Sequence, residues 1–210
     1  MSAYTEQEEL EKLKAWWKNY GGALVLGVVL GLGLLFGSKY WNEYQETRRQ
    51  AASDLYADMS RQARDGKVDA ARASATRLTA DYASTPYAGM AALMLARLSF
   101  DAGDRAAART HLQWAVDHAR DPATVHAARL RLGRLLLDAR EYDAALAQTQ
   151  ASSQAGFESE YAELRGDVYA AQGKTTEARE AYAAALKQLP ADTPHRGVLQ
   201  MKLDDLGGAP

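Results

Sequence analysis

The sequence predicts an all-α protein, in which a single N-terminal transmembrane helix is followed by an α-solenoid of paired helices. Three observations lead to this fold class. They are one long uncharged segment near the N-terminus, helical periodicity of apolar residues after it, and a regular spacing of turn residues. Prolines number only 5 among the 210 residues, so long uninterrupted helices can form.

The uncharged segment covers residues 19–38 and lies between Lys18 and Lys39. In a helix these 20 residues rise by about 30 Å, which matches the thickness of a bilayer's hydrocarbon core. Aromatic side chains stand at both ends, as expected at the two membrane–water interfaces: Trp16, Trp17, Tyr20, Tyr40 and Trp41. We therefore predict a transmembrane signal anchor at residues 19–38.

A cleaved signal peptide and a buried helix of a soluble protein are the alternatives to an anchor at residues 19–38. A cleaved signal peptide has a shorter apolar region, of about 7–15 residues, and ends at a small-x-small cleavage site. Here the apolar segment runs into FGSKYWNEY, where no such site occurs. A buried helix of a soluble protein is disfavoured by the aromatic residues at both ends and by six glycines in the segment.

The charges beside the anchor favour neither orientation, because three basic residues precede it and three follow it: Lys12, Lys14, Lys18, Lys39, Arg48 and Arg49. Long segments translocate largely regardless of charge, and the absence of cysteine is compatible with an oxidising compartment. We therefore predict a cytosolic N-terminal tail at residues 1–18 and residues 39–210 outside the cytoplasm. No glycine or proline occurs at residues 38–65, so we expect the anchor helix to continue into the first repeat.

Glycines in the anchor form two small-x-x-x-small pairs, Gly27/Gly31 and Gly33/Gly37. Such pairs let helix backbones approach closely in lipid. At about 100° per residue the two pairs lie on nearly opposite faces, with Gly22 on the face of the second pair. We expect these glycines to pack against neighbouring transmembrane helices, although glycine is frequent in such helices generally.

After the anchor, apolar residues recur at i, i+3 or i+4 and i+7, which is the pattern of amphipathic helices. The segments with this pattern are 87–98, 108–119, 125–139, 161–168 and 178–189. In the first of them the apolar face is formed by Tyr87, Met90, Ala91, Met94 and Leu98. We expect each segment to be a helix that buries its apolar face.

Turn residues between the predicted helices stand at Gly66, Gly103, Arg140 and Gly173, at intervals of 37, 37 and 33 residues. Glycine suits three of them because helices commonly end with a residue in the left-handed conformation. Five residues later there is always an alanine, which allows close helix packing: Ala71, Ala108, Ala145 and Ala178. The period resembles that of tetratricopeptide repeats, about 34 residues.

We therefore predict a tetratricopeptide-like repeat domain at residues 39–190 and a C-terminal capping helix and tail at residues 191–210. The last repeat fits the motif best, and the first is recognisable mainly from Gly66 and Ala71. An irregular helical bundle is the alternative architecture.

Enzymatic chemistry is not indicated by any motif in this sequence. The histidines His111, His118, His126 and His195 are scattered, cysteine is absent, and no spacing typical of a zinc site occurs. Fingerprints of nucleophile elbows, P-loops and dinucleotide sites are missing too. The net charge of −2 gives no basic footprint for nucleic acid. We expect a non-enzymatic protein without a cofactor or metal.

Arginines stand between the apolar positions of the predicted first helices, which line the concave surface of a solenoid. We expect Arg97, Arg131, Arg134 and Arg165 as groove contacts, with Arg129 and Glu163 as further polar positions. Guanidinium groups bind carboxylates through paired hydrogen bonds, so extended or acidic peptide segments are the expected ligands. The alternative is that these arginines only solvate the outer faces of the helices.

Three segments resemble the ancillary SecYEG translocon subunit family, usually called YfgM: EKLKAWWKNYGGALVLGVVLGLGLLFGSKYWNEYQ, AELRGDVYAAQGKTTEAREAYAAAL and LQMKLDDL. The resemblance implies a single-pass protein of a bacterial inner membrane, with a cytoplasmic N-terminus and a periplasmic repeat domain. It also implies association with the SecYEG translocon and with periplasmic chaperones, including a membrane-anchored peptidyl-prolyl isomerase-like chaperone. The protein would then help to hand unfolded, translocating polypeptides to those chaperones.

Two other functions remain open from the residues alone. The protein could be a scaffold subunit of another envelope assembly, such as a secretion or cytochrome-maturation complex, where similar repeats occur. If residues 19–38 are cleaved, it would instead be a secreted soluble peptide-binding repeat protein.

Overall fold

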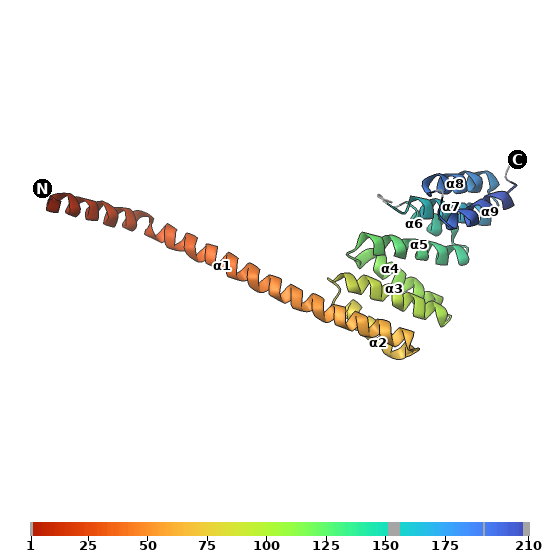
Figure 1. Ribbon diagram of the computed structural model, residues 1–210, viewed down its shortest axis with the longest axis horizontal. Helices are drawn as coiled ribbons and strands as arrows, with labels where there is room; N and C mark the ends of the chain where they lie inside the picture. The colour runs from red at the N-terminus through yellow and green to blue at the C-terminus, as the bar shows by residue number, and fades with distance from the viewer. Residues whose placement is uncertain (1, 151–155, 191, 208–210) are drawn as a thin grey trace. The chain divides into compact units, whose positions relative to one another are not determined.

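The computed structural model describes residues 2–150, 156–190 and 192–207, without the side chains of residues 2–9, 13, 23–26, 28–30, 33 and 35. Every regular element within these residues is a helix, which confirms the predicted all-α class (Figure 1). The helices are α1 (Ser2–Arg64), α2 (Val68–Asp81), α3 (Pro86–Asp101), α4 (Arg105–His118), α5 (Pro122–Asp138), α6 (Tyr142–Gln148), α7 (Glu158–Ala171), α8 (Thr175–Gln188) and α9 (His195–Asp205).

The chain divides into two compact units, residues 1–50 and residues 51–210. The first unit consists of the N-terminal part of α1, and the C-terminal part of α1 belongs to the second unit. Residues 38–64 are helical without interruption, as the absence of glycine and proline predicts. We call the second unit the repeat domain.

Among the residues described, no helix is both long enough and apolar enough to cross a membrane. The predicted anchor at residues 19–38 lies partly outside this description, because many of its side chains are among those not described.

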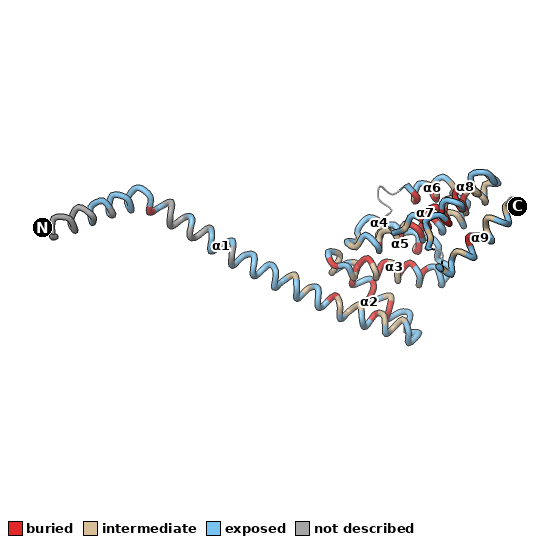
Figure 2. Tube along the Cα trace, turned by 45° about the horizontal axis from the view of Figure 1, so that its top comes forward, coloured by how far each residue is buried: buried red, intermediate tan, exposed pale blue. Residues whose placement is uncertain are grey.

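The repeat domain consists of successive helix pairs. The end of α1 and α2 form the first pair, which is followed by α3/α4, α5/α6 and α7/α8, and then by α9. The first helices of neighbouring pairs also contact one another, namely α3 with α5 and α5 with α7. The buried residues lie on the faces where helices meet (Figure 2). This is the packing expected of stacked helical repeats.

The four predicted turn residues all adopt the left-handed conformation. Gly66, Gly103 and Gly173 have φ angles of 73°, 81° and 74°, and Arg140 has a φ of 61°. The alanines five residues later, Ala71, Ala108, Ala145 and Ala178, are all buried. The repeat spacing read from the sequence therefore corresponds to real helix pairs, and the alternative of an irregular bundle is wrong.

Small residues permit the closest helix contacts. Gly166 of α7 lies so near the ring of Tyr182 in α8 that a Cβ atom there would overlap the ring carbons. Gly133 of α5 lies similarly close to Leu164 of α7. The first contact is within a repeat and the second is between repeats, so glycine sets the helix spacing in both directions.

The apolar face of α3 is broader than the predicted one. Ala91 is buried as expected, but Ala88, Ala92 and Leu95 are buried as well, whereas Met90 and Met94 remain partly exposed. The reason is that α3 packs against α2, α4 and α5, and also shares a hydrophobic cluster with the end of α1. A helix with several neighbours buries a wider arc than one apolar stripe.

Candidate functional site

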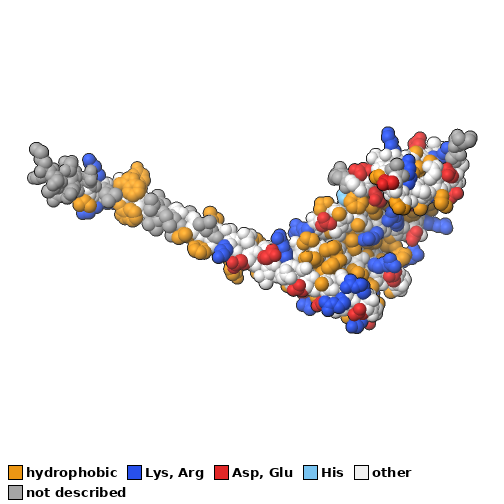
Figure 3. Space-filling view, in the orientation of Figure 1, with side chains coloured by type: hydrophobic (Ala, Val, Ile, Leu, Met, Phe, Trp, Pro, Cys, Tyr) orange, Lys and Arg blue, Asp and Glu red, His pale blue; other side chains and the backbone are white. Residues whose placement is uncertain are grey.

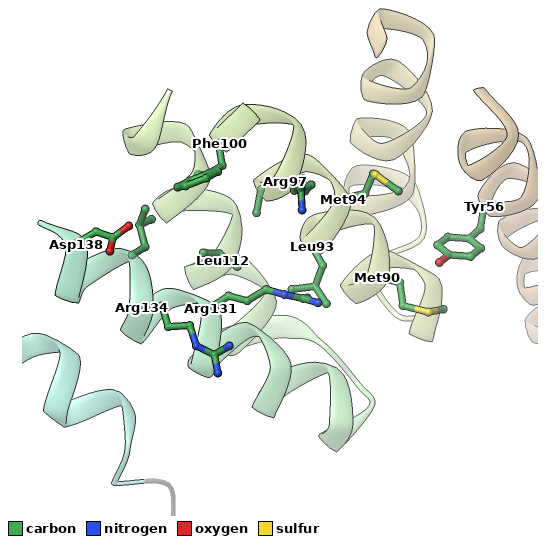
Figure 4. A pocket seen from close by; sticks show the side chains of 13 residues that line it. Tyr56, Met90, Leu93, Met94, Arg97, Phe100, Leu112, Arg131, Arg134 and Asp138 are labelled. Carbon is green, nitrogen blue, oxygen red and sulfur yellow. The ribbon is translucent and has the colours of Figure 1, made fainter. Parts of the chain in front are cut away.

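A pocket of about 520 Å³ opens on the repeat domain, lined mainly by residues of α3, α4 and α5 (Figure 4). Its apolar lining includes Met90, Leu93, Met94, Phe100, Leu112 and Leu135, and Tyr56 contributes from α1. Its polar lining consists of Arg97, Arg131, Arg134 and Asp138. Hydrophobic side chains also gather on one face of the repeat domain, with Lys and Arg side chains beside them (Figure 3).

Three of the four arginines predicted as groove contacts line this pocket. Arg97 comes from α3, and Arg131 and Arg134 come from α5. Arg165 of α7 is not among the lining residues and is half-buried elsewhere. Arg129 does not line the pocket either. Stacking of the second repeat on the third therefore brings residues 97 and 131 together.

The charges around the pocket are unequally compensated. The Nε atom of Arg97 donates to both carboxylate oxygens of Asp101, at 2.9 and 2.7 Å. Asp138 lies 3.8 Å from Arg105. Arg131 and Arg134 are exposed and form no ion pair with the residues described. Positive charge without a protein partner therefore lies on the α5 side.

Comparisons with known proteins show to which family the chain belongs. The chain matches the family model of the tetratricopeptide repeat-like domain over residues 14–208. It is 36% identical over 202 residues to the ancillary SecYEG translocon subunit of Neisseria gonorrhoeae, covering 96% of this chain and 97% of the relative. The chain belongs to the ancillary SecYEG translocon subunit family.

Further members of this family support the assignment. The ancillary SecYEG translocon subunit of Escherichia coli is 30% identical over 203 residues, covering 96% of each chain. That of Haemophilus influenzae is 26% identical over 201 residues, covering 96% of this chain and 97% of the relative. Because these matches extend over nearly the whole chain, they include the N-terminal segment as well as the repeats.

The sequence predicts Glu163 as a polar position in the groove, but its side chain is buried between α7 and α9. Its carboxylate accepts hydrogen bonds from Lys202 Nζ at 2.7 Å and from His195 Nε2 at 2.8 Å. Lys202 also donates to Asp167 at 2.7 Å. The groove expectation for Glu163 was wrong, because the sequence does not show that α9 folds back onto α7.

The network shifts the ionisation of its members. Burial opposes the charge of Glu163, but the hydrogen bonds from Lys202 and His195 outweigh it and lower the pKa of Glu163 below its ordinary value. Burial likewise opposes the charge of Lys202, while Asp167 and Glu163 together raise its pKa. The charged forms of Glu163 and Lys202 therefore stabilise each other.

The histidines occupy separate places. His126 Nδ1 lies 2.8 Å from the hydroxyl of Tyr161, and the His126 ring stacks on Phe157. His118 stacks on Trp114. Burial and the nearby Arg72 lower the pKa of His111. Within the part of the chain that the structure describes, no three His, Cys, Asp or Glu side chains are grouped to hold a metal ion.

Among the described glycines of the predicted anchor, only Gly21 lies so close to another side chain that a Cβ atom would crowd it. A Cβ at Gly21 would lie 3.0 Å from the indole ring of Trp17. A Cβ atom added at the helix-packing candidates Gly22, Gly27, Gly31 or Gly37 would have no packing contact within 4 Å, and the fifth candidate, Gly33, lies outside the described side chains. Packing of these glycines against another helix stays a prediction.

Proposed function

We propose that this protein is a non-enzymatic interaction subunit of the SecYEG translocon, anchored in the bacterial inner membrane by one helix. Its repeat domain lies in the periplasm, receives translocated polypeptides and helps to pass them to chaperones. The pocket between α3 and α5, in a chain related over nearly its full length to ancillary SecYEG translocon subunits, is the observation that carries this proposal.

The anchor in this proposal is the uncharged segment at residues 19–38, with residues 1–18 in the cytoplasm. Leu34 and Phe36 within it are 75% and 69% exposed, and Tyr40 and Trp41 just after it are also exposed. Large apolar side chains exposed along one helix favour an apolar surrounding, such as lipid or another membrane helix. The anchor glycines would then lie against helices of the translocon.

The pocket suits a receiver of many different polypeptides. Met90 and Met94 have flexible, polarisable side chains that adapt to apolar groups of different shape. The pocket is lined mainly by the first helices α3 and α5, with a smaller contribution from α4, and solenoid proteins commonly bind their partners on their first helices. Its arginines offer charge-assisted hydrogen bonds to side chains of the bound segment. Such a site can hold an unfolded segment without any chemical reaction.

Chaperones are the partners to which the bound chain would pass, including a membrane-anchored peptidyl-prolyl isomerase-like chaperone. This part of the proposal depends on the family to which the chain belongs. A translocon subunit that binds emerging segments reversibly would keep them from aggregating until a chaperone takes them. The arginines of the pocket are exposed to solvent, where salt screens their attraction, and this favours reversible binding.

Site-specific photo-crosslinking in native membranes tests the proposal. A photo-reactive phenylalanine analogue replaces Phe36 to probe the anchor and, in a second variant, Met94 to probe the pocket. In the control variant the analogue replaces Arg77, which is exposed on α2 outside the pocket. We expect adducts with a SecYEG subunit from position 36. From position 94 we expect adducts with exported polypeptides or a periplasmic chaperone, identified by mass spectrometry.

Two results would contradict the proposal. Adducts from position 36 with no translocon subunit, but with components of another envelope complex, would favour the scaffold alternative. A mature protein whose mass lacks residues 19–38 would show that the segment is cleaved and that the protein is not anchored by it.

A further inference from the structure

The apolar part of the pocket can accept side chains but not a folded domain. A volume of about 520 Å³ lies within the range of about 300–1,000 Å³ that is typical of sites for small ligands. Met90, Leu93 and Met94 line it from α3, while Leu112 and Leu135 line it from α4 and α5. One or two large apolar side chains of a bound segment fit such a space.

The charged side chains on the rim of the pocket are unequally paired. The guanidinium of Arg97 is already neutralised by Asp101. Arg131 and Arg134 have no carboxylate partner among the described residues, and residues three apart on a helix lie on the same face. Two uncompensated positive charges therefore stand together on the α5 side of an apolar pocket.

We propose that the pocket binds acidic amphipathic segments of unfolded polypeptides. A long apolar side chain of the segment enters between the α3 methionines and Leu135, and carboxylates one to three residues away pair with Arg131 and Arg134. Each guanidinium can bind a carboxylate through two parallel hydrogen bonds. The inference rests on the proposed function, since it names the class of polypeptide that the repeat domain receives.

The test measures binding of defined peptides to the full-length protein purified from membranes in detergent. The probe is a fluorescein-labelled 12-residue peptide of Gly and Ser with two Leu followed by two Glu. Matched peptides carry Gln or Lys in place of Glu, or Ser in place of Leu. By fluorescence anisotropy we expect the Glu peptide to bind about tenfold more tightly than the Gln peptide, and the difference to shrink at high salt.

A charge swap tests the two arginines. In the double variant Arg131→Glu and Arg134→Glu, the Glu peptide should lose about tenfold or more in affinity, while the Lys peptide should gain. That gain would also show that the pocket is still folded. The control variant, Arg77→Glu with Arg120→Glu, makes the same change in net charge at exposed positions outside the pocket. It should bind the Glu peptide as the unaltered protein does.

Several outcomes would overturn the inference. Equal affinity for the Glu and Gln peptides would show that the charged rim does not select the ligand, and equal affinity of the Leu and Ser peptides would exclude the apolar pocket. If none of the peptides binds, the pocket is not a peptide-binding site. The proposed function is judged separately, because crosslinking from Phe36 to SecYEG does not depend on the pocket.

Discussion

At the residue scale, Arg140 stands where the other three turns have glycine. Its φ of 61° is close to that of Gly66 and Gly173, at 73° and 74°. Its backbone also donates to Leu137, and that of Glu141 donates to Leu136, each at 2.9 Å. This turn therefore has the same backbone conformation as the glycine turns. Arginine is unfavourable in it, because a residue with a side chain loses about 1 kcal/mol or more of stability in the left-handed region.

Replacing Arg140 by glycine should relieve this strain. We expect Arg140→Gly to raise the free energy of unfolding by about 1 kcal/mol, less the entropy that glycine adds to the unfolded chain. Urea denaturation followed by circular dichroism measures the change. The converse substitution, Gly103→Ala, should lower stability by a similar amount. An unchanged or lower midpoint for Arg140→Gly would show that the turn is not strained.

At the scale of elements, α9 is attached to the repeats by both polar and apolar contacts. Leu199 is fully buried, and Arg196 Nη1 donates to the carbonyl of Leu186 at 2.8 Å. Lys202 and His195 hold the buried Glu163 from the α9 side. A buried carboxylate that loses its partners is costly, so the network makes the attachment of α9 dependent on charge.

Acid should weaken this attachment. Because the pKa of Glu163 in the folded protein lies below its ordinary value of 4.5, its stabilising effect is present above pH 4.5 and is lost as the pH falls through the folded pKa. We expect Glu163→Gln to lower stability by about 1–3 kcal/mol at pH 7, with a smaller difference from the unaltered protein at pH 3.5. Urea denaturation at both pH values measures the effect.

Hydrogen exchange locates this effect and provides its control. At pH 7, Glu163→Gln should increase exchange in α9 (His195–Asp205) more than in α3. Glu180→Gln removes an exposed carboxylate from α8 outside the network and should change neither quantity. A Glu163→Gln variant with the same pH dependence as the unaltered protein would show that the network does not hold α9.

At the scale of the whole molecule, the proposed function depends on which side of the membrane carries the repeat domain. The basic residues around residues 19–38 are balanced, so their charges do not decide the orientation. The proposed function requires residues 39–210 in the periplasm, where exported chains emerge.

Protease treatment of spheroplasts should reveal this topology. We expect added protease to digest the repeat domain and to leave a small membrane-bound fragment that retains an epitope tag at the N-terminus. The physical reason is that a bilayer shields the spanning helix and the cytoplasmic tail from the enzyme. A cytoplasmic marker protein must stay intact as the control. Protection of the entire chain until the membrane is dissolved would reverse the orientation.

The sequence by itself determined the helical class, the repeat spacing and the turn residues. These are local properties: apolar periodicity needs only neighbours along one helix, and the left-handed conformation at Gly66, Gly103 and Gly173 depends on residue type. Even Arg140 was identifiable as a turn, because its spacing and Ala145 indicated one. The predicted anchor at residues 19–38 likewise depends on composition alone and stays a prediction.

Only the tertiary structure decided which side chains meet. Arg97 and Arg131 are 34 positions apart and share a pocket, whereas Arg165 does not join them. Met90 and Met94 line that pocket instead of entering the core, and Glu163 is buried against Lys202 of α9. Such contacts depend on how successive helix pairs stack and on where α9 folds back. Both result from packing among several helices, which no single stretch of sequence encodes.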